Sequence, residues 1–157
     1  MGVVEDRLAE LGLTVPEVVP PVAAYVPAVL DGSRVYTSGQ LPMVAGSMAA
    51  TGKVGEGEGL VSPEVAKELA QACALNAIAA IKGVIGDLDK VQRVVKVVGF
   101  VASDPSFTGQ PAVINGASEL LGKAFGDKGI HARSAVGVAA LPLDAPVEVE
   151  VIVHVAD

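Results

Sequence analysis

The sequence predicts an α+β fold in which helices cover one face of a β-sheet. Patterns typical of helices and strands follow one another without strict alternation. Segments 62–86 and 110–126 have apolar residues at helical spacing, whereas segments 91–103 and 131–155 are dense in valine, which favours strands. The 157 residues suffice for one hydrophobic core, so we expect a single domain over residues 1–157.

The N-terminal residues predict a short amphipathic helix. Val4, Leu8 and Leu11 recur at helical spacing, and Gly12 ends the pattern. We therefore expect a helix within residues 1–13.

A hairpin is expected next. The segment PEVVPPVAAYVPAV contains four prolines, which exclude a helix interior and a central strand, although Tyr25–Leu30 can form an edge strand. A turn at Asp31-Gly32 leads the chain back through RVYTSGQLP.

The glycine-rich segment from Met43 to Leu60 is expected to be mainly loop. It lacks the spacing of a phosphate-binding loop, so we interpret it as surface.

The first long helix begins with a clear capping signal. Ser62 can cap it, and Pro63 occupies the first turn, where the missing N–H costs nothing. The apolar stripe continues to Gly86 and includes Cys73. Because no histidine is placed to activate this thiol, we interpret Cys73 as a small buried residue.

A strand at 91–103 precedes the second helix, which has Pro111 in its first turn. Asn115 lies inside this helix, where asparagine is unfavourable because it competes for backbone hydrogen bonds. It is either exposed and incidental or bonded to something specific. Residue pattern alone favours the first alternative.

The last two runs are predicted to form a hairpin around LPLDAP, with Ala140 opposite Val147. That register places one face in the core: Ser134, Val136, Val138, Val149, Val151 and Val153. The other face carries Arg133, Glu148 and Glu150 among small residues and is either a solvated surface or a closely packed interface. Because Arg133 and Glu148 would lie about 20 Å apart, a ligand touching both would bind between subunits.

Composition excludes several classes of function. The net charge of -7 and an aromatic content of 3% disfavour nucleic-acid binding. A single cysteine and two distant histidines give no metal-ligand spacing, so no metal site is expected. We expect no membrane segment, because no apolar run approaches about 18 residues, and no signal peptide. A cytoplasmic location follows by default.

Several stretches from Tyr25 onward resemble the Rid family of reactive-intermediate deaminases, also called the YjgF or L-PSP endoribonuclease family. These are YVPAV, YTSGQLP, CALNAIAAI, GDLDKVQRVVKVVGFVAS, FTGQPAVINGASELL and HARSAVGVAALPLDAPVEVEV. The last is the most specific. The resemblance implies a chorismate-mutase-like fold, with two main helices on one face of a mixed sheet, assembled as a homotrimer with sites between subunits. It also implies hydrolysis of enamines or imines to 2-oxo acids and ammonia without a cofactor.

Carried over by position, Arg133 matches the arginine that grips the substrate carboxylate, and Glu148 matches the acid that positions or activates water. Tyr25 and Asn115 match pocket-lining positions, and Ser38 belongs to the matching T-S-G-Q stretch. The resemblance thus favours a specific role for Asn115.

The chain departs from the archetypal members at four places. It has Ala23-Ala24 where glycine and proline are common, Ala135 in the pocket where cysteine is frequent, His131 before the arginine, and an added N-terminal helix. It therefore resembles a divergent branch. The leading hypothesis is a metal-independent deaminase of small 2-imino acids. The alternatives are a trimeric binder of a small carboxylate without turnover and, less favoured, an endoribonuclease or translation inhibitor.

Overall fold

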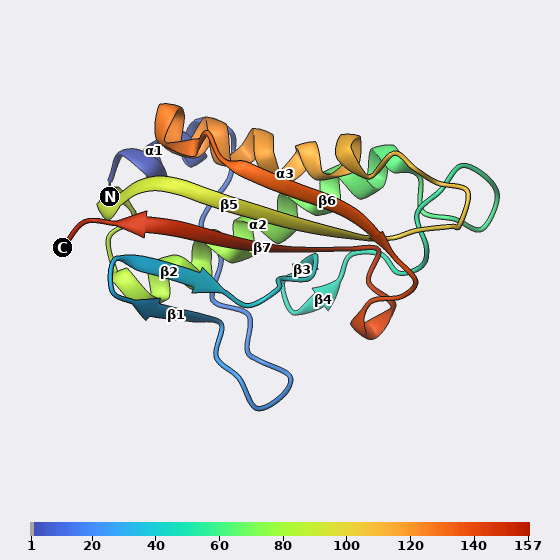
Figure 1. Ribbon diagram of the computed structural model, residues 1–157, viewed down its shortest axis with the longest axis horizontal. Helices are drawn as coiled ribbons and strands as arrows, with labels where there is room; N and C mark the ends of the chain where they lie inside the picture. The colour runs from blue at the N-terminus through green and yellow to red at the C-terminus, as the bar shows by residue number, and fades with distance from the viewer. Residues whose placement is uncertain (1) are drawn as a thin grey trace.

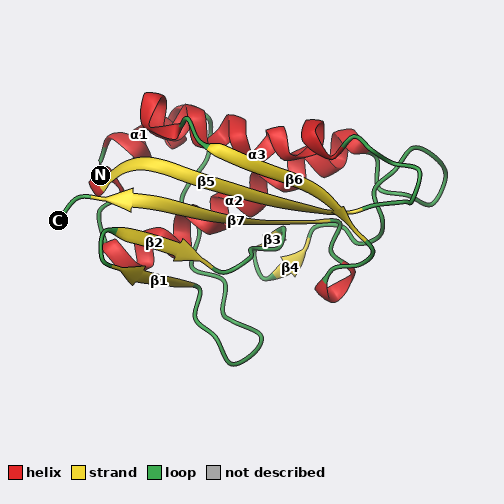
Figure 2. Cartoon of the chain, in the orientation of Figure 1, coloured by secondary structure: helices red, strands yellow, loops and turns green. Residues whose placement is uncertain are grey.

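The computed structural model describes residues 2–157. A five-stranded sheet is covered on one face by two long helices, and a two-stranded ribbon lies beside it (Figures 1 and 2). In chain order the elements are α1 Val3–Glu10, β1 Ala28–Asp31, β2 Arg34–Thr37, β3 Met43–Val44, β4 Ser47–Met48, α2 Pro63–Ile85, η1 Leu88–Lys90, β5 Val91–Ala102, α3 Gln110–Phe125, η2 Gly126–Gly129, β6 Ala132–Val138, η3 Pro142–Asp144 and β7 Val147–Val155.

The predicted α+β fold with helices on one face is confirmed. The two long helices form where expected, and the Ser62 hydroxyl caps α2 by accepting from the Val65 N–H. The hairpin β1–β2 is also confirmed. Its register pairs Asp31 with Arg34, so the turn residues are Gly32 and Ser33, one position later than predicted.

The predicted hairpin between the last two strands is wrong. The strand order is β1-β2-β7-β5-β6, so β5 lies between β6 and β7. Strand β5 pairs with β6 in parallel and with β7 antiparallel. A strand with hydrogen-bonding partners on both edges and helices on one face accounts for the density of valine in β5.

The core lies between the sheet and helices α2 and α3. Alternate residues of β7 are buried, from Val147 to Val155, and point toward the helices. Helix α2 is long and apolar enough to cross a membrane, but more than half of its most apolar window is buried inside the protein. Burial of this kind is typical of a helix in the core of a folded domain.

Helix α1 is held by a carboxylate from outside the helix. Gly2 at its N-terminus offers no side chain, and Asp89 accepts from the backbone N–H groups of Val3 and Val4 at 2.9 and 3.1 Å. These two hydrogen bonds lower the pKa of Asp89 below its ordinary value. Asp89 therefore stabilises the docked helix in its ionised form.

We expect Asp89→Ala to destabilise the protein by about 1 kcal/mol, the usual cost of a lost N-cap. Because the folded state lowers the Asp89 pKa, this contribution is complete above the ordinary value of 3.8 and is lost as the pH falls through the lowered value. Amide exchange of α1 as a function of pH measures the effect. Asp31→Ala, at the exposed end of β1, is the control. Equal protection of α1 in wild type and Asp89→Ala would contradict the assignment.

Candidate functional site

The faces of β7 are as predicted, with Val149, Val151 and Val153 in the core, but those of β6 are reversed. Arg133, Ala135 and Gly137 pair with Val97, Gly99 and Val101 of β5, which are buried against the helices. They therefore lie on the helix-covered side of edge strand β6. The predicted core residues Ser134 and Val136 lie on the uncovered face and are exposed, and Val138 is half-buried. The prediction failed because it paired β6 with β7 directly.

Arg133 is anchored by helix α3. Its Nη1 donates to Asn115 Oδ1 at 2.8 Å and to Ser118 Oγ at 3.3 Å, and its Nη2 donates to the Pro111 carbonyl at 3.2 Å. Guanidinium has five N–H donors. Within residues 2–157, the Nε–H and one Nη2 N–H have no protein acceptor. Two neighbouring donors of this kind match the two oxygens of a carboxylate.

A histidine supports this anchor through Ser118. His131 Nε2 lies 2.8 Å from Ser118 Oγ, and His131 Nδ1 lies 2.6 Å from the Gly129 carbonyl. A carbonyl oxygen only accepts, so His131 Nδ1 donates to Gly129, and Ser118 Oγ accepts from Arg133. In the tautomer with its proton on Nδ1, His131 Nε2 can accept from the Ser118 hydroxyl.

Glu148 lies on the other side of the sheet, packed against the chain just after β2. A side chain added at Gly39 would meet its carboxylate, so glycine at position 39 makes room for Glu148. The neighbouring Ser38 donates through Oγ to the Val26 carbonyl at 2.6 Å, and the Tyr25 hydroxyl accepts from the Val22 N–H at 3.3 Å. Tyr25, Ser38 and Glu148 thus belong to one region of the molecule.

The carboxyl group of Glu148 is half-buried, and its environment disfavours ionisation. Desolvation raises the pKa of Glu148, and the negative charge of nearby Glu150 raises it further. A carboxyl group with a raised pKa is better able to accept and return a proton near neutral pH.

The structure therefore separates the expected site residues into two groups. Asn115, Arg133 and Ala135 lie between β6 and α3, whereas Tyr25, Ser38 and Glu148 lie near the end of β2. Arg133 is opposite Val97 and Glu148 is opposite Phe100, on the two outer edges of β5 and on opposite faces. This places their backbones about 14 Å apart, closer than the predicted separation, but with the sheet between their side chains. One chain does not bring Arg133 and Glu148 to the same small ligand.

A family model described as "YjgF/chorismate mutase-like, putative endoribonuclease" matches residues 5–155. The chain belongs to the YjgF family.

Relatives match over nearly the whole length. Protein TCP17 of Trypanosoma cruzi is 44% identical over 156 residues, which cover 98% of this chain and 94% of TCP17. The crystal structure of Atu1372 from Agrobacterium tumefaciens, a protein of unknown function, has a TM-score of 0.90 at 46% identity and covers 98% of this chain and 93% of its own. Escherichia coli TdcF with bound serine has a TM-score of 0.57 at 26% identity, covering 90% of this chain and 94% of its own.

Of the two alternatives for Asn115, the structure shows the second: its side chain accepts a hydrogen bond from Arg133. This agrees with the role that the resemblance to the YjgF family implies. The sequence reasoning missed Ser118 as a partner of Arg133 and left His131 without a role. Their spacing of 13 residues across η2 carries no recognisable signal, because only the packing of α3 on β6 brings them together.

The interpretation of Cys73 is confirmed, since the side chain is buried and desolvation raises its pKa well above the ordinary value. Within residues 2–157, no group of three or more His, Cys, Asp or Glu side chains could hold a metal ion.

The raised pKa of Glu148 predicts that its ionised carboxylate destabilises the folded protein. The folded state favours the protonated acid, so its stability falls as the pH rises from the ordinary value of 4.5 through the raised pKa. We therefore expect Glu148→Gln to raise the melting temperature at pH 7, and the difference to vanish below about pH 4. Glu58→Gln in the exposed loop is the control. A lower melting temperature for Glu148→Gln at pH 7 would show that the ionised carboxylate stabilises the protein.

Proposed function

We propose that this protein is a metal-independent deaminase that hydrolyses small 2-imino acids to 2-oxo acids and ammonia. The observation that carries the proposal is the Arg133 guanidinium, which three protein acceptors fix in place while two N–H donors stay free. A rigid fork of this kind suits the carboxylate of an imino acid. The serine bound to the relative TdcF supports a ligand of similar size and charge.

Glu148 supplies the proton transfers. The carbon of a protonated imine is electrophilic, so the reaction needs a positioned water and a base more than strong activation. Water adds to the carbon while Glu148 accepts one of its protons. Glu148 then returns the proton to the nitrogen. The carbon–nitrogen bond breaks and ammonia leaves while Glu148 takes the hydroxyl proton, so that the carbonyl forms, and Glu148 passes this proton to solvent. The raised pKa of Glu148 favours this exchange.

A homotrimer would complete the site. Because Arg133 and Glu148 lie on opposite faces of one sheet, each site would combine Arg133 of one subunit with Glu148 of the next. The uncovered sheet face is suited to an interface, since it carries exposed apolar residues. These are Val29 on β1, Tyr36 on β2 and Val136 on β6. Exposed apolar residues on an open sheet face are typical of contacts between chains.

The direct test generates 2-iminopropionate and 2-iminobutyrate from an amino-acid oxidase and traps them with semicarbazide. Added wild-type protein should lower the rate of semicarbazone formation, and neither Arg133→Ala nor Glu148→Ala should do so. The same preparation should not cleave RNA, in keeping with its net charge of -7. If wild type leaves semicarbazone formation unchanged, deamination of these imines is rejected and a carboxylate binder without turnover becomes the better account.

A mixing experiment tests the shared site. Arg133→Ala and Glu148→Ala, each inactive alone, are unfolded together and refolded as mixed oligomers. About one site in four then receives both an intact Arg133 and an intact Glu148, so about one quarter of the activity should return. No recovery from mixed oligomers would place both residues in a site within one subunit, contrary to the proposal.

His131 acts as a positioning residue for Arg133. We expect His131→Phe, which cannot accept from Ser118, to raise the KM for the imino acid by about fivefold, because one hydrogen bond that orients the anchor is lost. His131→Gln keeps an acceptor and should stay within about twofold of wild type. A common loss in both variants, or a change in kcat alone, would argue against a role through Ser118.

A further inference from the structure

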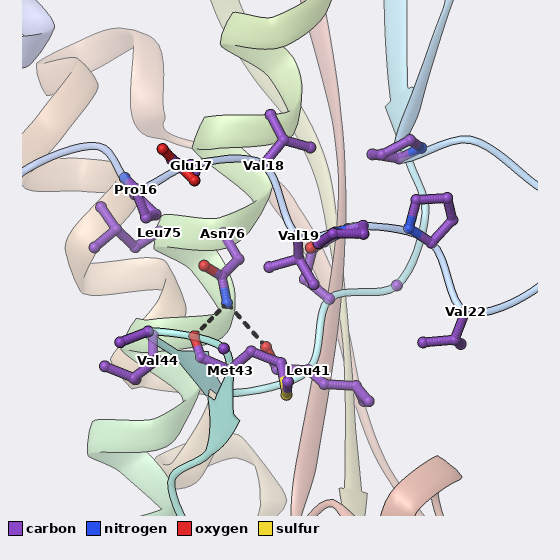
Figure 3. A pocket seen from close by; sticks show the side chains of 18 of the residues that line it. Pro16, Glu17, Val18, Val19, Val22, Leu41, Met43, Val44, Leu75 and Asn76 are labelled. Carbon is purple, nitrogen blue, oxygen red and sulfur yellow. Dashed lines mark hydrogen bonds between the residues drawn. The ribbon is translucent and has the colours of Figure 1, made fainter.

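A second candidate binding site lies away from Arg133. Residues 16–22, which we call the strap, cross over α2 and enclose a pocket of about 800 Å³ with the segment 39–46 (Figure 3). A side chain at position 83 would meet Val18 of the strap, so glycine there lets the strap lie close to α2. The volume is within the range of pockets that bind small molecules.

The lining of this pocket is mainly apolar and contains no cation. Valine and proline from the strap face Leu75 of α2 and Leu41 and Met43 beyond β2. Among the lining residues there is no Lys, Arg or His, and the only charged one is Glu17. A carboxylate or phosphate would therefore enter without a positive partner and near a negative charge, which is unfavourable.

Two buried amide residues, Asn76 and Gln40, line the pocket, and Figure 3 shows how the Asn76 side chain is held. Asn76 on α2 is 3% exposed, and its Nδ2 donates to the Leu41 and Met43 carbonyls, both at 3.0 Å. Its Oδ1 points away from both carbonyls (Figure 3), and within residues 2–157 no protein donor is bonded to it. Within residues 2–157, every fully buried side-chain oxygen has a hydrogen-bond partner. Because Asn76 Oδ1 has no protein donor, it is not fully buried and a ligand can reach it. Asn76 thus offers one fixed hydrogen-bond acceptor to a ligand.

We propose that the strap pocket binds an uncharged apolar molecule that carries one N–H or O–H donor, with the donor bonded to Asn76 Oδ1. Apolar walls supply the affinity and the fixed acceptor of Asn76 sets the orientation, as in small-molecule sites generally. The ligand class is the opposite of the carboxylates suited to Arg133. The proposal therefore goes beyond the deaminase and stands whether or not imines are hydrolysed. The pocket reaches the deaminase residues only at Tyr25 and at Gly39, which backs onto Glu148.

Three dyes of similar shape test the ligand class with the full-length protein. N-phenyl-1-naphthylamine is neutral with one N–H, 8-anilinonaphthalene-1-sulfonate adds an anionic group to the same rings, and 1-phenoxynaphthalene replaces the N–H by an ether oxygen. The neutral amine should bind with enhanced fluorescence. The ether should compete about fivefold more weakly, and the sulfonate at least about tenfold more weakly. Equal or tighter binding of the sulfonate would overturn the proposal.

Two substitutions on the same helix locate the site. Ala72 lines the pocket and is only half-buried, so Ala72→Phe fills the space without entering the core. Val65 lies on α2 outside the pocket and is 42% exposed, so Val65→Phe is the matched control. Ala72→Phe should weaken binding of the amine at least about tenfold with an unchanged melting temperature, and Val65→Phe should not. Absence of dye binding to wild type, as expected if a second copy fills the pocket, or equal binding by both variants, overturns the proposal.

Discussion

Arg133→Lys should lower the kcat/KM for imino-acid hydrolysis by about 100-fold, although the charge is kept. The two free donors of Arg133 lie in one rigid plane, and three protein acceptors set that plane. Lysine has a compact ammonium group on a flexible stem. It cannot bond Asn115, Ser118 and the Pro111 carbonyl while presenting two parallel donors to a carboxylate. Semicarbazide-coupled rates at several substrate concentrations measure the loss.

The matched control is Arg7→Lys on α1, since Arg7 is exposed and lies outside both groups of site residues. Its kinetic constants should equal those of wild type. Arg133→Ala should lower kcat/KM more than Arg133→Lys does, because it removes the charge as well as the planar pair of donors. If Arg133→Lys retains most of the activity, a point charge is sufficient and the fork does not position the substrate.

Gly116→Ala should be the most destabilising single methyl addition, at about 3 kcal/mol. A Cβ at position 116 would lie 1.9 Å from the backbone carbonyl oxygen of Lys67, so α2 and α3 would have to move apart. The clash is with backbone, so no side-chain rotation relieves it. The greater helix propensity of alanine offsets only about 1 kcal/mol. Urea denaturation measures the change.

Gly122→Ala on the same helix is the control. A Cβ at Gly122 meets nothing within 4 Å, so alanine should stabilise the protein by up to about 1 kcal/mol. Because Asn115 precedes Gly116, a displaced α3 would also move the acceptor that holds Arg133. We therefore expect the folded fraction of Gly116→Ala to bind carboxylates poorly. Equal stability of the two variants would show that α3 shifts over α2 without cost.

The local elements could be predicted because their signals are carried by neighbouring residues. The Ser62-Pro63 cap, the apolar stripe of α2 and the period of α3 depend only on residues a few positions apart, and each helix formed as predicted. The hairpin β1–β2 likewise depends on one short turn, and its position differed by a single residue.

Strand order could not be predicted in the same way. The valine runs of β5, β6 and β7 are compatible with several pairings, and residues 132–155 look like a hairpin because they are adjacent in sequence. In the structure β5 lies between β6 and β7, because β5 has the most buried residues of the five strands and pairs along both of its edges. A change of partner also changes which alternate residues share a face. For that reason Arg133 lies on the helix side, contrary to the prediction, whereas Glu148 lies on the open side as predicted.

The sequence by itself determined the fold class, the helices with their caps, and the family resemblance that singled out Arg133, Asn115 and Glu148. Tertiary structure alone decided which of these residues meet. The bonds from Arg133 to Asn115 and Ser118 arise where α3 packs on β6, and the sheet separates Glu148 from them. The physical reason is that helix and strand periods are local, whereas strand order and helix packing depend on how distant segments bury their apolar faces together.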